Sequence, residues 1–140
     1  MRTPILLLAT LLLATTPALR AAQPPDPALT QSLQTVTNNT LEAGLRTLYA
    51  NRVWLAQEMM EKLTPVTRNL GDIIDTEIVA VQPVSKRVTR YYVAIYFTRC
   101  PLWLRIERYA NKEQAFYLPL RFSTNPDEIL PGYVTEFYTQ

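Results

Sequence analysis

The sequence contains no histidine, a single cysteine and only three glycines in 140 residues. Without histidine the chain lacks the side chain that most often acts as an acid or base near neutral pH, and the commonest metal ligand. The glycines, at positions 44, 71 and 132, cannot form a phosphate-binding loop, and no acidic cluster has the spacing of a metal site. We therefore expect neither a nucleophilic triad nor a metal, and no cofactor.

The sequence also lacks a large excess of either positive or negative charge. The chain carries 14 Lys and Arg against 12 Asp and Glu, a formal net charge of +2. So small an excess provides no electrostatic footprint for nucleic acid, and we expect no nucleic-acid partner. Cys100, as the single cysteine, excludes an internal disulfide. We expect it to be a small buried or turn residue, with an intermolecular bridge as the alternative.

Residues 1–22 have the pattern of a secretory signal peptide. Arg2 precedes an apolar stretch at 5–14, and small residues that suit cleavage follow it. A stretch of this length is too short to span a bilayer as a helix, although an uncleaved anchor stays open as an alternative. We expect a periplasmic or secreted protein with an N-terminal arm at 23–27, a single domain at 28–140 and no transmembrane span in the mature chain.

Apolar periodicity predicts helices in the first half of that domain. Asp26 as N-cap and Pro27 in the first helical position predict a helix through about Val36. From Leu41 to Leu63 apolar residues recur every three or four positions, which predicts one long helix or two helices joined near Asn51. Thr64 and Pro65 are expected to end it, with one further turn that stops at Gly71.

Strand patterns follow. Residues 73–81, 87–99, 102–109 and 116–122 are rich in β-branched and aromatic residues. The parity of the first of these strands is ambiguous. In the second strand the odd positions are apolar, and in the third the even positions, so the apolar faces coincide if Cys100 and Pro101 form a two-residue hairpin loop. A wider loop of the same parity is the alternative.

Under the two-residue loop Phe97 pairs with Leu104, and Ile95 with Ile106. Pro119 cannot donate to a ladder, which indicates an open side on the fourth strand. The predicted fold is α+β, with N-terminal helices packed on one face of a curved antiparallel four-stranded meander.

The order of helices, a Leu-Gly turn and an antiparallel meander resembles the ketosteroid-isomerase-like, or SnoaL-like, cone fold of the nuclear-transport-factor-like superfamily, and within it small exported bacterial proteins of unknown function. The resemblance covers most of the mature chain, although 114–116 read Gln-Ala-Phe where many relatives have Gly-Trp. It implies a fold, with helices closing the concave side of a bent sheet, and no activity. The segments that carry it are 69–72, 87–93, 101–104, Tyr109, 122–125 and 129–131.

The second face of the meander is the predicted binding or interface surface. Tyr, Trp and Arg have apolar bodies and polar tips, and they are enriched where proteins bind. Under the expected register Tyr96 lies opposite Arg105, and Tyr92 opposite Tyr109. Three alternatives stay open for this face, in decreasing order of weight: a solvated surface, a homodimer or partner surface, and a site where arginines bind a small anion. Its predicted residues are Arg90, Tyr92, Tyr96, Trp103, Arg105, Glu107, Tyr109, Tyr117 and Arg121.

The sequence favours a non-catalytic exported binding or interaction module, with an unknown protein partner or self-association through the outer sheet face. A ketosteroid-isomerase-like enzyme is an alternative and would need Asp75, Glu77 or Glu107 inside the cone beside a phenol such as Tyr91. A carrier of small hydrophobic ligands is another. It would use a pocket between helix and sheet lined by Tyr49, Trp54, Met59 and Met60, although such spacing is more typical of core.

Overall fold

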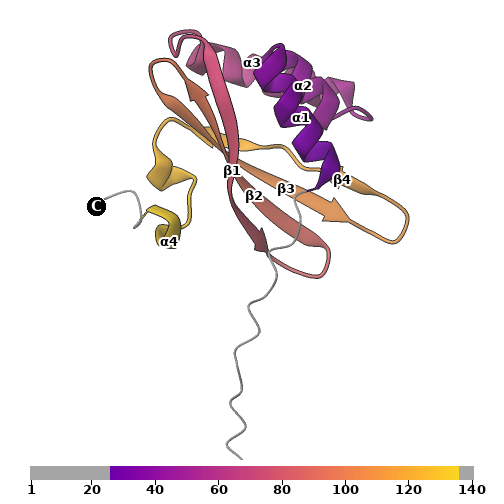
Figure 1. Ribbon diagram of the computed structural model, residues 1–140. Coiled ribbons are helices and arrows are strands. Elements are labelled where there is room, and N and C mark those ends of the chain that lie inside the picture. The colour runs from indigo at the N-terminus through magenta and orange to yellow at the C-terminus, as the bar shows by residue number, and fades with distance from the viewer. Residues whose placement is uncertain (1–25, 136–140) are drawn as a thin grey trace, which may run out of the picture.

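The computed structural model describes residues 26–135. The expected signal peptide at 1–22, and the arm before Asp26, lie outside the described residues. Figure 1 shows helices on one face of an antiparallel sheet and the C-terminal elements on the other. The helices are α1 (Pro27–Asn38), α2 (Leu41–Leu48), α3 (Val53–Thr67) and the short α4 (Gly132–Thr135), with a 3-10 turn, η1, at Pro126–Glu128.

The sheet confirms the predicted α+β class with N-terminal helices. Its order is β1-β2-β3-β4, and β5 also pairs with β3. The expected fourth strand is two short strands separated by Leu118, Pro119 and Leu120, so the sheet has five strands rather than four. The strands are β1 (Ile73–Pro83), β2 (Val88–Phe97), β3 (Pro101–Ala110), β4 (Ala115–Tyr117) and β5 (Arg121–Ser123).

The helix region divides as the second alternative predicted. α2 ends at Leu48 and α3 begins at Val53, with the break around Asn51. The prediction that Thr64 and Pro65 end the helix is wrong, because α3 continues to Thr67 with Pro65 inside it. Proline removes the hydrogen bond to the residue four positions before it, which here is Glu61, an exposed residue of α3.

The hairpin register differs from the two-residue loop. Leu104 pairs with Val93 rather than Phe97, and the last paired residues are Tyr96 and Pro101. The displacement is even, so the apolar faces still coincide, and parity could not choose between the two registers. The wider loop forms because Thr98 N–H donates to Asp72 O (2.9 Å) and Arg99 N–H to Leu70 O (3.0 Å), which ties it to the turn after α3.

Two irregularities explain the ambiguous parity of β1. The register with β2 shifts between Ile73 and Asp75 and again between Ile78 and Ala80. Each bulge exchanges the faces to which odd and even residues point. No single alternation could therefore describe the strand.

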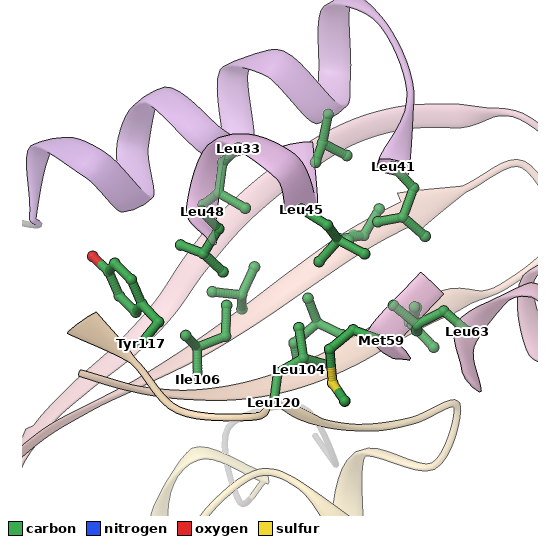
Figure 2. Packing of buried hydrophobic residues seen from close by; sticks show 14 of the residues in the cluster. Leu33, Leu41, Leu45, Leu48, Met59, Leu63, Leu104, Ile106, Tyr117 and Leu120 are labelled. Carbon is green, nitrogen blue, oxygen red and sulfur yellow. The ribbon is translucent and has the colours of Figure 1, made fainter. Parts of the chain in front are cut away.

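The main core lies between the helices and the inner face of the sheet (Figure 2). Leucines from α1 and α2 meet Met59 of α3 and the side chains of β2 and β3. The labelled members of this cluster are Leu33, Leu41, Leu45, Leu48, Met59, Leu63, Leu104, Ile106, Tyr117 and Leu120.

A second apolar cluster covers the opposite face of the sheet. Three apolar residues of the C-terminal segment, defined here as residues 126–134, pack on side chains of β2 and β3. The sheet is thus buried on both faces at its centre. The cluster consists of Tyr92, Ala94, Trp103, Ile129, Leu130 and Val134. Within residues 26–135, no helix is long and apolar enough to cross a membrane.

We predict that Gly44→Ala destabilises the fold by about 1–3 kcal/mol, because α1 and α2 touch there. A Cβ at Gly44 would lie 2.1 Å from Val36 Cγ2 and 3.0 Å from Ser32 O. The same position also receives the Ser32 hydroxyl, which donates to Gly44 O (2.7 Å). Urea unfolding measures the change.

Gly132→Ala is the matched control, since a Cβ there would meet nothing within 4 Å. Equal unfolding midpoints for Gly44→Ala and the unaltered protein would contradict the close approach of the two helices.

Candidate functional site

The structure divides the nine predicted surface residues among three environments. Tyr92 and Trp103 lie beneath the C-terminal segment, with Tyr96 packed against the same cluster. Tyr117 lies on the other side of the sheet, in the main core. The remaining residues stay partly or fully accessible at the end of the sheet away from the β2–β3 loop: Arg90, Arg105, Glu107, Tyr109 and Arg121.

Tyr92 and Trp103 lie on the outer sheet face, as predicted, but they are buried there rather than accessible to a partner. Their exposed fractions are 3% and 8%. The apolar side chains of Ile129, Leu130 and Val134 pack on the outer sheet face. This contact removes them from water and buries the sheet residues beneath them. Trp103 is thus not available for a contact with another molecule while this segment is in place.

Tyr117 is the second correction. It points toward the helices because β4 and β5 are separate strands, so the even parity of Leu120 and Phe122 does not extend back through the break. The register also changes two predicted pairs. Tyr92 lies opposite Arg105, and Tyr109 lies opposite Val88.

A basic patch, defined here as Arg90, Arg105, Arg121 and the Glu107 among them, occupies the uncovered outer face. Glu107 Oε1 accepts from Arg90 Nε (2.8 Å) and Nη2 (2.7 Å), and lies 3.9 Å from Arg105 Nε. Arg105 and Arg121 are direct cross-strand partners on β3 and β5. Arg121 is exposed, and no described carboxylate forms an ion pair with it.

Neighbouring polar groups hold one side of the patch in place. Burial alone would lower the pKa of Arg90, but hydrogen bonds to Tyr92 and Glu107 outweigh it, so the pKa lies above its usual value. Gln82 Oε1 accepts from Tyr92 OH (3.0 Å) and from Arg90 Nη1 (3.5 Å). Hydrogen bonds therefore hold the Arg90 guanidinium in position and keep it charged, whereas the exposed guanidinium of Arg121 is accessible to an anion.

Aromatic rings border the patch at Tyr109. Its ring centroid lies 5.3 Å from that of Phe116 on β4. The guanidinium carbon of Arg52, which precedes α3, lies 3.9 Å from the Phe116 centroid. These contacts join the end of the sheet to the helical layer through a cation–π interaction.

The carboxylates considered for an isomerase do not occupy the interior. Asp75 and Glu77 are exposed on β1, and Glu107 belongs to the basic patch. Glu77 Oε2 accepts from Tyr96 OH at 2.6 Å, on the outer face. The enzyme hypothesis required one of these acids to lie inside the cone beside a phenol such as Tyr91. In the described structure none of the three does.

Sequence reasoning missed an interaction at Asp26, which it read as a helix cap. The side chain makes no capping hydrogen bond. It accepts a hydrogen bond from Tyr117 OH and lies 3.4 Å from Arg108 Nε. Arg108 and Tyr117 are cross-strand partners on β3 and β4, so their shared face could have been inferred from the register, but their proximity to Asp26 could not.

This Asp26 cluster raises the pKa of two tyrosines. Burial is the larger cause at Tyr117, followed by its hydrogen bond to Asp26. The pKa of Tyr91 is also raised, first by burial and then by the charge of Asp26. Because Arg108 neutralises the carboxylate, the cluster is suited to fastening α1 to the sheet rather than to proton transfer.

The interior pocket expected for a hydrophobic ligand is occupied by core. Met59 is fully buried and Tyr49 OH donates to Leu118 O (2.9 Å). Trp54, which was expected to line the pocket, is 64% exposed on the outside of α3. In residues 26–135, no group of three or more histidine, cysteine or acidic side chains is placed to hold a metal ion.

Comparison with known proteins adds no relative: no family model, curated protein or solved structure matches the chain.

The Asp26 cluster predicts that stability falls at alkaline pH. The folded protein raises the pKa of Tyr117 above the value of about 10 in an unfolded chain. Its contribution is therefore complete below that pH and is lost as the pH rises beyond it. Urea midpoints measured from neutral pH to well above pH 10 should fall less steeply for Tyr117→Phe than for the unaltered protein.

Tyr133→Phe, at an exposed tyrosine, is the control and should keep the original slope. If Tyr117→Phe also keeps that slope, Tyr117 does not carry the alkaline loss.

The covered outer face gives a second prediction. Leu130→Ala should cost about 2–4 kcal/mol in unfolding free energy and should expose Trp103. In a Trp54→Phe background, where Trp103 is the single tryptophan, its emission should shift to the red and acrylamide should quench it more strongly.

Tyr133→Ala removes an exposed ring from the same segment and should leave the emission unchanged. If Leu130→Ala changes neither the emission wavelength of Trp103 nor its quenching by acrylamide, the segment does not shield Trp103.

Proposed function

We propose that the protein is a non-catalytic binding or interaction module that contacts an anionic ligand or partner through the basic patch. The main observation in support of this proposal is that Arg105 on β3 and Arg121 on β5 are direct cross-strand partners. Like charges opposite each other in a sheet are unfavourable. An anionic group bound between them removes that repulsion, and arginine binds carboxylate or phosphate in a bidentate manner.

The distribution of charge supports this assignment. The patch holds three guanidinium groups and one carboxylate, Glu107, which pairs with Arg90 at 2.7 Å and makes no ion pair with Arg121. Arg105, at 3.9 Å, receives only a weak share of it. The basic patch therefore carries positive charge that no carboxylate within residues 26–135 neutralises, and the sheet fixes the position of that charge.

We also propose export to the periplasm or the exterior, from the signal-peptide pattern at 1–22, and a cone fold of the ketosteroid-isomerase-like kind. The α-then-β order and the helices over one sheet face support the cone fold. A homodimer through the outer face would have to use the basic patch or displace the C-terminal segment.

The test is a titration with inorganic phosphate and with citrate, in which the NMR signals of the arginine Nε–H groups report binding. Signals of Arg105 and Arg121 should shift, and Arg121→Gln should weaken binding by at least about fivefold. Arg68→Gln, at an exposed site on the helical side, removes the same charge and should have no effect. Equal weakening by both variants, or no shift at all, would refute the assignment.

Sedimentation velocity of the mature chain examines self-association. A monomer in the presence and absence of the anion fits a ligand-binding module. A dimer that Arg121→Gln dissociates would assign the patch to a homodimer instead.

A further inference from the structure

A cleft of about 490 Å³ lies between α1 and the first half of β1, away from the basic patch. Its lining is mainly apolar groups and hydroxyls, together with two acids from β1 and no lysine or arginine. In Figure 1 α1 lies beside β1, the long strand that forms one edge of the sheet. The lining residues are Thr30, Leu33, Gln34, Thr37, Asn38, Asp75, Thr76, Glu77 and Ile78.

The free edge of β1 borders this cleft. In the described sheet β1 pairs with β2 alone. Thr76 N–H donates to the carboxylate of the preceding Asp75 (2.8 Å) rather than to β2, so it points to the free edge. In an antiparallel strand the next residue but one points the same way, so the N–H and C=O of Ile78 are also on that edge. An incoming strand can therefore pair there, with one of its carbonyl groups replacing the Asp75 carboxylate as the acceptor of Thr76 N–H.

The two faces of β1 define what that strand must carry. Asp75 and Glu77 lie on the outer face, where Glu77 meets Tyr96. Thr76 and Ile78 lie on the inner face. Thr76 Oγ1 is 3.2 Å from Thr37 Oγ1, and Ile78 packs against the main core. Side chains of paired strands meet on the same face, so the occupant needs basic groups on one face and apolar groups on the other.

The same geometry disfavours a second copy of this chain. Antiparallel pairing of two β1 strands about Thr76 would set Asp75 of each copy against Glu77 of the other. Like charges directly opposite one another destabilise a sheet. The bulges at Ile73/Asp75 and Ile78/Ala80 also restrict the regular edge to Asp75–Ile78, which limits the ladder to a short segment.

We propose that this cleft binds an extended segment of a partner protein in which basic and apolar residues alternate. The segment adds as a short antiparallel strand to the edge of β1. Its lysines or arginines pair with Asp75 and Glu77, and its apolar residues enter the cleft between Ile78 and Leu33 of α1. Backbone hydrogen bonds provide affinity, and the alternation provides selectivity.

The test uses a capped peptide of about six residues in which Lys alternates with Val. Amide NMR signals of Asp75–Ile78 and of Leu33–Thr37 should shift on titration, while those of the basic patch should not. The isomeric peptide with all its lysines first should bind at least about tenfold more weakly, because its charges do not meet one face.

A charge exchange makes the assignment specific. Asp75→Lys combined with Glu77→Lys should lose the Lys-Val peptide and bind the corresponding Glu-Val peptide at this edge, with shifts in the amide signals of residues 75–78, whereas the Glu-Val peptide should not shift those signals in the unaltered protein. Glu113→Lys, on the exposed β3–β4 loop, should bind the Lys-Val peptide as before. Failure of the charge exchange, with the fold intact by circular dichroism, would overturn the proposal.

A backbone-blocked peptide separates strand addition from simple attraction of charges. Methylation of alternate backbone nitrogens, on the edge that faces β1, should abolish binding. If the methylated peptide binds as well as its parent, the contact is electrostatic and the strand addition is wrong.

Discussion

The central hairpin of the sheet has to bury both of its faces. In β2 the residues from Tyr91 to Ile95 are all buried, although alternate side chains point in opposite directions. On the inner face they meet the leucines of α1 and α2, and on the outer face they meet Ile129, Leu130 and Val134. The helices and the C-terminal segment are placed by this requirement, since each covers one side of the same two strands.

Because the middle of the sheet is closed on both sides, the surfaces available for recognition lie at its margins. The basic patch is on the outer face of β2, β3 and β5, and the acidic cleft is at the free edge of β1. Arg121 is exposed and excess positive charge collects around it, whereas Asp75 and Glu77 carry negative charge with no basic side chain in the cleft lining. A nearly neutral chain thus presents two locally charged regions of opposite sign, which a net charge does not reveal.

Much of the architecture could be predicted from local patterns. Alternation in β2 and β3 identified the inner face, because aliphatic residues such as Val93, Ile95 and Leu104 recur at every second position. Pro27 and the break near Asn51 marked helix ends for reasons of backbone chemistry. The outer face was harder to interpret, because tyrosine and tryptophan suit both a wet surface and a buried one. Tyr92 and Trp103 were assigned to the surface, and a segment that follows Ser123 buries them.

The sequence by itself determined the order of helices and strands, the parity of the central hairpin and the absence of histidine chemistry. These depend on residue type and on spacing along the chain. Only the tertiary structure decided the hairpin register, the burial of Tyr117 beside Asp26 and the covering of Trp103. Each depends on contacts between distant residues, such as Thr98 with Asp72 or Asp26 with Tyr117, and an even shift of register or a change of cover leaves the local pattern unaltered.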